Sequence, residues 1–192
     1  MDRNLRMVMV YFLYLFSAWS VFRYFVRLPE IIEELWFKPV IFLVPLFFIY
    51  MSKGEKPKLW RGNIFSSVVL GLIVGVILRV VFYMVLKESL NFSLEKTLVS
   101  ILIATVEQLT FAGLLLPLIR KSIKSSLRAS LMVAVMYGLI HIPILWLAQG
   151  LWINTMVGVF LLNFCISFIA NMTFLNTKNL SSPILIEMLI LL

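Results

Sequence analysis

Long apolar segments separated by short basic stretches run through the whole sequence. An α-helix needs roughly 20 apolar residues to cross the hydrocarbon core of a bilayer, and such a helix satisfies its own backbone hydrogen bonds there. The residues are 62% hydrophobic and 14% charged, with a mean hydropathy of +1.03, and a soluble domain does not have this composition. The sequence therefore predicts an all-α, polytopic transmembrane helical bundle, organised as a single membrane-embedded domain over residues 1–192.

About six full spans and one shorter C-terminal helix are expected. The predicted spans are 7–26, 39–52, 63–86, 97–119, 129–148 and 152–175. The last apolar segment, 180–192, is too short for a full span, so it either inserts part-way against the bundle or ends early. The charged stretch 29–37 is expected to lie along the membrane interface or to serve as a connector.

The net charge of +8 does not indicate a nucleic-acid partner. The basic residues sit at the ends of apolar segments, where they set topology and touch the headgroups of the lipid bilayer. Eleven of them fall on the side of the N-terminus and of the loop 120–128, and five fall on the other side. The positive-inside rule therefore predicts an integral membrane protein with a cytoplasmic N-terminus, which we expect in a prokaryotic cell membrane. The single Cys165 excludes a disulfide framework.

Two ionisable residues interrupt neighbouring apolar segments. Glu107 lies thirteen residues before Arg120, and His141 lies thirteen residues after Arg128, so each is about 20 Å from the same basic loop. A short loop makes the two helices antiparallel neighbours, which places the carboxyl and imidazole groups at the same depth. Ionisable groups in a membrane are costly and often functional. The pair either activates a water by general acid–base chemistry or forms a buried hydrogen bond that locks two helices.

Two other spans carry small or polar residues four positions apart, on one face of each helix. Gly71 and Gly75 form a small-xxx-small packing face that also contains Arg79. Arg79 is expected either to keep the buried carboxylate of the neighbouring segment ionised or to extend to the outer interface. Asn163 and Asn171 form a polar stripe that either makes interhelical hydrogen bonds or lines a wet cavity.

Three short motifs carry a family resemblance. The first reads Glu107, Gln108, Leu109, Thr110, Phe111, Ala112, Gly113 and then LLLP; the second runs from Tyr137 to His141; the third places Glu187 and Leu191 four and eight residues after Pro183. They resemble the motifs of the CPBP family of intramembrane proteases, also called Abi or CAAX-protease-like. That family has two glutamates, two variable positions, Phe, Arg and Gly; then Phe, three residues and His; then His and Asn after the proline. The resemblance covers a core of about residues 97–192.

The resemblance implies an intramembrane endopeptidase that cleaves a peptide or membrane-associated protein. In the family, the first-motif glutamate and the second-motif histidine activate a water, which makes Glu107 and His141 the catalytic candidates. Gln108 replaces the second glutamate, and Ala112 replaces the arginine. The third-motif donors for the oxyanion are replaced by Glu187 and Leu191, and losing one such donor typically costs ~100–1,000-fold in rate. The alternative is a catalytically silent relative that acts as a membrane binding, bacteriocin-immunity or regulatory scaffold protein.

The remaining expectations concern the lining and cofactors of the site. Its predicted lining consists of Gln108, Phe111, Tyr137, Glu187, Asn163, Asn171 and Arg79. No cofactor is expected. A divalent metal such as Zn is a weak alternative, held by Glu107, His141 and Glu187, because two carboxylates and one histidine suit that ion.

The topology prediction is tested by a cysteine placed in the loop 120–128 of a Cys165→Ser background. We expect a maleimide that cannot cross the membrane to label it only after the membrane is opened, because this loop belongs to the basic side. Labelling in intact cells would invert the predicted orientation.

Overall fold

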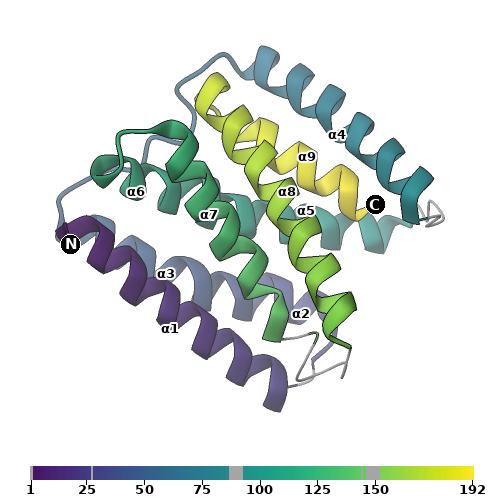
Figure 1. Ribbon diagram of the computed structural model, residues 1–192, viewed down its shortest axis with the longest axis horizontal. Coiled ribbons are helices and arrows are strands. Elements are labelled where there is room, and N and C mark those ends of the chain that lie inside the picture. The colour runs from purple at the N-terminus through teal and green to yellow at the C-terminus, as the bar shows by residue number, and fades with distance from the viewer. Residues whose placement is uncertain (1, 27, 87–92, 144, 146–151) are drawn as a thin grey trace.

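The computed structural model describes residues 2–26, 28–86, 93–143, 145 and 152–192. Its elements are α1 (Arg3–Phe25), α2 (Glu30–Ile32), the π-helical stretch η1 (Glu33–Phe37), α3 (Lys38–Ser52), α4 (Ile64–Leu86), α5 (Leu94–Gln108), the π-helical stretch η2 (Leu109–Leu115), α6 (Leu116–Ser122), α7 (Ser126–Ile140), α8 (Ile153–Thr177) and α9 (Ser181–Leu191). Figure 1 shows these helices packed as one bundle, with α9 between α4 and α8. The predicted all-α membrane bundle is confirmed.

Five helices of the described chain are long and apolar enough to cross a membrane, namely Arg3–Phe25, Glu33–Ser52, Ile64–Met84, Leu94–Ser122 and Ile153–Thr177. The fifth predicted span, 129–148, is instead represented by the shorter α7, and part of that span lies outside the described residues. Among the described residues, five long apolar helices are thus combined with two shorter ones, α7 and α9.

The charged stretch 29–37 is helical from Glu30 onwards, and Glu33 and Glu34 face the protein. It continues through α2 and η1 into α3, and it carries Glu33, Glu34 and Lys38 into the protein, where all three are buried. The side chain of Glu33 pairs with Arg23 of α1. Burial of charges is tolerated only when they are paired, so this pairing explains why the stretch enters the bundle.

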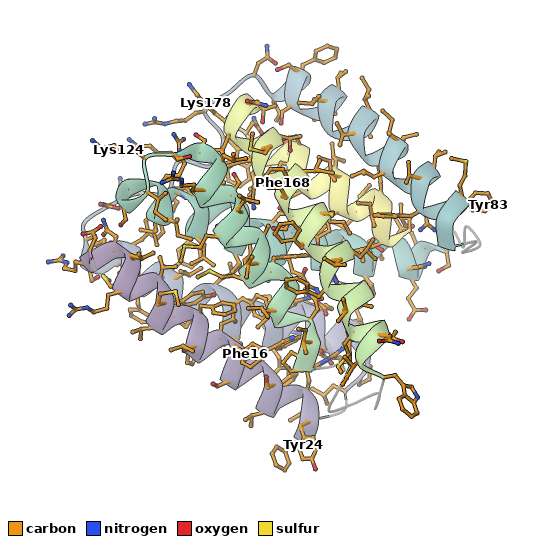
Figure 2. All side chains as sticks on the ribbon, viewed as in Figure 1. Phe16, Tyr24, Tyr83, Lys124, Phe168 and Lys178 are labelled. Atoms are coloured by element: carbon orange, nitrogen blue, oxygen red, sulfur yellow. The ribbon has the colours of Figure 1, made fainter. Side chains whose placement is uncertain are left out.

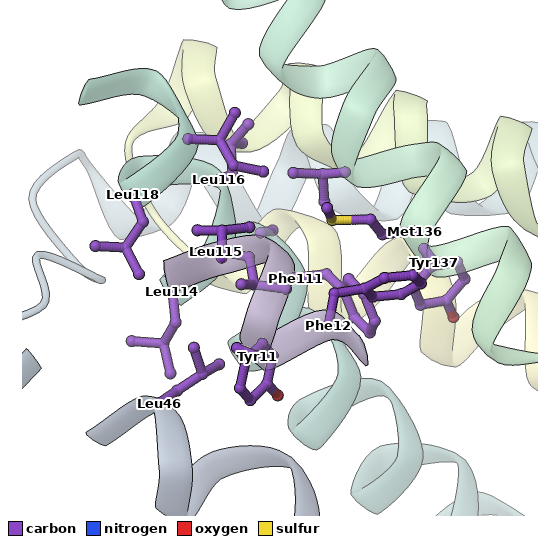
Figure 3. Packing of buried hydrophobic residues seen from close by; sticks show 14 of the residues in the cluster. Tyr11, Phe12, Leu46, Phe111, Leu114, Leu115, Leu116, Leu118, Met136 and Tyr137 are labelled. Carbon is purple, nitrogen blue, oxygen red and sulfur yellow. The ribbon is translucent and has the colours of Figure 1, made fainter. Parts of the chain in front are cut away.

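The largest apolar cluster lies where α1, α3, η2, α6 and α7 meet (Figure 3). Phe111 of η2 and Tyr137 of α7 are in its middle, with ring centroids 5.0 Å apart in an edge-to-face arrangement. Two tyrosine hydroxyls bind carbonyl oxygens within the cluster: Tyr11 donates to Phe42 at 2.6 Å, and Tyr50 donates to Leu114 at 2.8 Å. These bonds satisfy polar groups that would otherwise be buried at a cost.

One face of α4 packs against α9 from near the start of α9 to near its end. This is the face that the small-residue spacing predicts to be a packing face. Near the start of α9, the backbone N–H of Ser182 donates to Ser67 Oγ at 3.0 Å. Near its end, Arg79 donates to the carbonyl of Ile190 at 3.1 Å. Between these contacts, Gly71 and Gly75 let the two helices approach so closely that a Cβ at either glycine would meet α9.

Replacing Gly71 by Ala tests this packing. The added Cβ would lie 2.8 Å from the Cα and 2.9 Å from the carbonyl oxygen of Ser182, which is backbone and cannot rotate away. We expect a lower melting temperature in detergent, equivalent to about 1–3 kcal/mol of overpacking. Gly158→Ala is the matched control, because it adds a Cβ with nothing within 4 Å. Equal melting of the two variants would contradict the close packing of α4 on α9.

Candidate active site

Glu107 and His141 lie next to each other at one end of the α5–α7 pair. Glu107 is in the last turn of α5, and His141 caps the C-terminus of α7. The distance from His141 Nε2 to Glu107 Oε2 is 3.6 Å. The His141 side chain is 25% exposed and the Glu107 side chain is 5% exposed. His141 therefore forms the accessible edge of the site, and Glu107 forms its buried floor. The structure thus brings together the two residues that the hairpin argument paired.

The backbone of α7 fixes the protonation pattern of the imidazole. His141 Nδ1 lies 2.8 Å from the carbonyl oxygen of Tyr137, one turn earlier in the helix. A carbonyl only accepts hydrogen bonds, so Nδ1 carries the hydrogen and Nε2 of the neutral ring is the basic nitrogen. The basic nitrogen therefore faces the Glu107 carboxylate. At 3.6 Å the two atoms are too far apart for a direct hydrogen bond.

Tyr137 joins Glu107 to Glu187 of α9. Its hydroxyl oxygen lies 2.5 Å from Glu107 Oε2 and 2.7 Å from Glu187 Oε1. Gln108 Nε2 donates to the other oxygen of Glu187 at 2.5 Å. All four side chains are buried. Gln108, Tyr137 and Glu187 stand at positions where this chain departs from the family motifs, and they bond to one another.

Counting hydrogens assigns the charge within this network. The tyrosine hydroxyl has one hydrogen, yet it makes short contacts with two carboxyl oxygens, so one carboxyl group must supply a second hydrogen. Glu107 has a lysine on its other oxygen, which favours the ionised form, whereas the other oxygen of Glu187 accepts from Gln108. The hydrogen bonds are complete when Glu187 Oε1 carries the proton and donates to Tyr137, which donates to Glu107.

The cation beside Glu107 is Lys38, which sequence reasoning missed. Lys38 Nζ lies 2.6 Å from Glu107 Oε1 and 2.7 Å from Glu34 Oε2, one turn earlier in its own helix. The sequence places Lys38 among the cations of the outer side, but its side chain is only 4% exposed. The available signal was the pair Glu34 and Lys38, four residues apart at the start of an apolar segment.

The expected pairing of Arg79 with Glu107 is therefore wrong. Arg79 points towards protein, as predicted, but its guanidinium donates to the Ile190 carbonyl at the end of α9. From the sequence, Arg79 and Glu107 can be compared only by their positions along two helices. This comparison carries no information on which helix lies beside α5, and the helix that brings a cation to Glu107 is the one containing Lys38.

Both π-helical stretches adjoin this charge cluster. Stretch η1 lies between Ile32 and Lys38, and η2 begins two residues after Glu107. A π-helical turn contains an extra residue, which changes the register of the side chains that follow it and is frequent at functional sites. Within η2, Phe111 packs against the ring of Tyr137, which in turn lies 4.8 Å from the His141 ring by centroids. Phe111, which the sequence predicts to line the site, thus contributes to it indirectly by packing against the ring of Tyr137.

Asn163 and Asn171 belong to a different part of the bundle. Asn163 Nδ2 donates to the Val159 carbonyl of its own helix at 3.0 Å. Asn171 Nδ2 lies 3.3 Å from Ser167 Oγ and 3.5 Å from the Ser130 carbonyl of α7. Asn163 thus bonds within α8, and the contact between Asn171 and Ser130 agrees with the predicted interhelical hydrogen bonding. The structure does not join either asparagine to the Glu107 network.

The residues proposed as a metal set do not form one. Across the described residues, no group of three or more His, Cys, Asp or Glu side chains is placed to hold a metal ion. The Tyr137 hydroxyl is bonded to the carboxyl groups of both Glu107 and Glu187.

The fold, with its long apolar helices, is that of an integral membrane protein. A family model described as type II CAAX prenyl endopeptidase Rce1-like matches residues 89–191. Because this match spans more than half of the 192 residues, the chain belongs to the Rce1-like family of CAAX protease-like membrane proteins. The resemblance inferred from the three motifs is confirmed. Searches of curated proteins and of solved structures each found no match.

A double-mutant cycle on thermal stability tests the Lys38–Glu107 contact. We expect Lys38→Met and Glu107→Gln each to lower stability, by about 3–5 kcal/mol where a buried charge is left without its partner. The double variant should lose less than the sum of the two, because it leaves no stranded charge from this pair.

Arg79→Met combined with Glu107→Gln is the control cycle. Its effects should add, since the Arg79 contact lies on the Ile190 carbonyl. Additivity in the Lys38 cycle, or coupling in the Arg79 cycle, would contradict the assignment of the cation.

Proposed function

We propose that this chain is an intramembrane endopeptidase in which Glu107 and His141 activate a water for hydrolysis of a peptide bond. The substrate class is a peptide or a membrane-associated protein, as family membership suggests. One observation carries the proposal: the basic nitrogen of His141 faces the Glu107 carboxylate at 3.6 Å, and its other nitrogen is held by the α7 backbone. An unprotonated, partly exposed nitrogen beside a carboxylate supports the role of general base that we propose for His141.

The reaction follows from this geometry. A water beside His141 Nε2 gives its proton to the imidazole while its oxygen attacks the carbonyl carbon of the substrate. The ionised Glu107 stabilises the imidazolium that forms, and Lys38 holds the far oxygen of Glu107 at 2.6 Å so that the carboxylate keeps its orientation. When the C–N bond breaks, His141 returns the proton to the departing amine, which restores the neutral ring.

The oxyanion of the intermediate needs donors that the third motif no longer supplies. Leu191 cannot donate, and Glu187 already takes part in the Tyr137 network. The amide of Gln108 has two N–H groups and uses one of them on Glu187 Oε2. Its second N–H, next to Glu107 in the chain, is the donor that we assign to the oxyanion.

The same network favours a second candidate function. Gln108, Tyr137 and Glu187 satisfy one another, and Tyr137 also occupies an oxygen of Glu107. A site closed in this way suits a catalytically silent relative that binds a peptide or a membrane protein, as in bacteriocin immunity or a regulatory scaffold. The two candidates differ in whether Glu107 is needed for cleavage or only for stability.

We also propose the membrane placement that the basic residues suggest. Lys124 and Lys178 lie at the same end of the bundle, and Tyr24 lies at the opposite end (Figure 2). The positive-inside rule supports a cytoplasmic location for the lysine-bearing end and for the N-terminus, in a prokaryotic cell membrane. The Glu107–His141 level then lies nearer the outer face.

Cleavage of a membrane-anchored reporter in liposomes tests the first proposal. Glu107→Gln and His141→Ala should each reduce the rate by about 100–10,000-fold, the usual contribution of a general base. Glu95→Gln is the matched control, because it makes the same change at an exposed position of the same helix and should leave the rate unchanged. Melting temperatures separate loss of chemistry from loss of folding.

Cleavage by the wild type no faster than by Glu107→Gln would support the silent relative. In that case Glu187→His combined with Leu191→Asn, which restores the family donors, should raise the rate above that of the wild type. Efficient cleavage by the wild type would show that positions 187 and 191 are not where the oxyanion is held.

A further inference from the structure

A basic cavity of about 700 Å³ lies far from the Glu107 network, between the loop 53–62, the end of α6 and the end of α8. Glu107 and Arg120 are thirteen residues apart along α5, η2 and α6, which places the cavity about 20 Å from the proposed active site. Its volume is in the range of sites that bind small molecules or lipid headgroups, roughly 300–1,000 Å³. Neither the proposed proteolysis nor the silent alternative uses it.

The cavity has fixed walls. The backbone N–H groups of Arg61 and Gly62 donate to the Lys178 carbonyl at 2.9 and 3.1 Å, and the N–H of Leu180 donates to the Leu59 carbonyl at 3.0 Å. Gly62 is required there, since a Cβ would lie 1.7 Å from the Thr177 carbonyl oxygen. The loop is therefore bound to the α8–α9 turn, so the backbone positions from which the cations of both segments extend are fixed relative to each other.

Positive charge dominates the lining. The basic side chains around the cavity are Lys56, Lys58, Arg61, Arg120, Lys121 and Lys178. Glu55 is the one carboxylate among the lining residues, and it pairs with Lys121. That contact lowers the pKa of the Glu55 carboxyl from its ordinary value, so Glu55 stays charged and bound to Lys121. The other five cations form no ion pair with a carboxylate in the described part of the chain.

The inner wall of the cavity is apolar. Pro117, Phe174 and Leu175 contribute to it, together with the ring of Tyr50, whose hydroxyl is already bound to the Leu114 carbonyl. A free phosphate ion makes no favourable contact with an apolar wall, whereas a phospholipid carries glycerol and acyl groups next to its phosphate that pack against one. The cavity also lies where α3, α6 and α8 end, which is the level at which a bilayer places its headgroups.

We propose that this cavity binds an anionic phospholipid, with the phosphate held by Arg61 of the loop and Arg120 of α6 and the glycerol region against Pro117 and Phe174. Guanidinium groups suit this role because their N–H groups match phosphate oxygens in pairs. The bound lipid bridges the loop and two helices. It therefore stabilises the bundle at its basic end.

Melting temperatures in micelles with increasing phosphatidylglycerol test this proposal. We expect a rise for the wild type that saturates with lipid, and little rise with phosphatidylcholine or with inorganic phosphate at the same concentration. Arg61→Gln combined with Arg120→Gln should lose at least half of the rise. Lys124→Gln combined with Arg128→Gln removes the same charge from the same end of the bundle, outside the cavity, and should keep the rise.

Equal loss in the two double variants would overturn the proposal, because it would show general attraction to a basic surface. An equal rise in melting temperature with inorganic phosphate would overturn the proposal in favour of binding of a free anion. An equal rise with phosphatidylcholine would also overturn it, because it would show that the cavity does not select a negatively charged lipid. Failure of the wild type to respond to phosphatidylglycerol would also overturn it. If the Arg61 and Arg120 double variant does not fold, each single variant is measured, and at least one must lose part of the rise.

Discussion

The ionised carboxylate of Glu107 inside an apolar bundle is the constraint on which the rest of the site depends. Left alone, such a charge would be far too costly to bury. Lys38 contacts one oxygen at 2.6 Å, and Tyr137 contacts the other at 2.5 Å. Glu107 therefore depends on a lysine from α3 and a tyrosine from α7, two helices that are distant from it in the sequence. The same demand for pairing accounts for the burial of Glu34, which contacts Lys38 from the charged stretch before α3.

The sequence predicted the parts of the fold that depend on local pattern. Apolar length located the helices, and the spacing of Ser67, Gly71, Gly75 and Arg79 identified the face of α4 that packs on α9. Equal distance from the basic loop paired Glu107 with His141. The sequence could not predict which distant helix lies beside Glu107 and brings a cation to it, because that depends on the lateral order of the helices in the bundle. Lys38 was missed and Arg79 was misassigned for this reason. The extra residues of the two π-helical stretches also leave no signal in a periodic pattern.

The helix α9 contributes to the site although it has only eleven residues in the structure. Its eleven residues contact α4 through glycine, and it carries Glu187 into the network from the opposite side to α7. Because α4 covers its outer side, α9 can present a carboxyl group to the interior without exposing it to lipid. The close approach at Gly71 and the polar network at Glu187 are therefore two sides of one packing arrangement.

The departures from the family motifs become consistent when they are considered together. A glutamate in place of the third-motif histidine would strand a carboxyl group in the protein interior, at a substantial energetic cost. Gln108 in place of the second glutamate removes a like charge and supplies a donor to Glu187 Oε2 at 2.5 Å. Tyr137 in place of the motif phenylalanine adds the hydroxyl that contacts Glu187 Oε1 at 2.7 Å. Each of these substitutions alone would leave an unsatisfied or repulsive group, whereas the three together satisfy both oxygens of Glu187 and one oxygen of Glu107. The three substitutions thus form one hydrogen-bonded set, and the Glu107–His141 contact remains in place beside it at the open edge of the site.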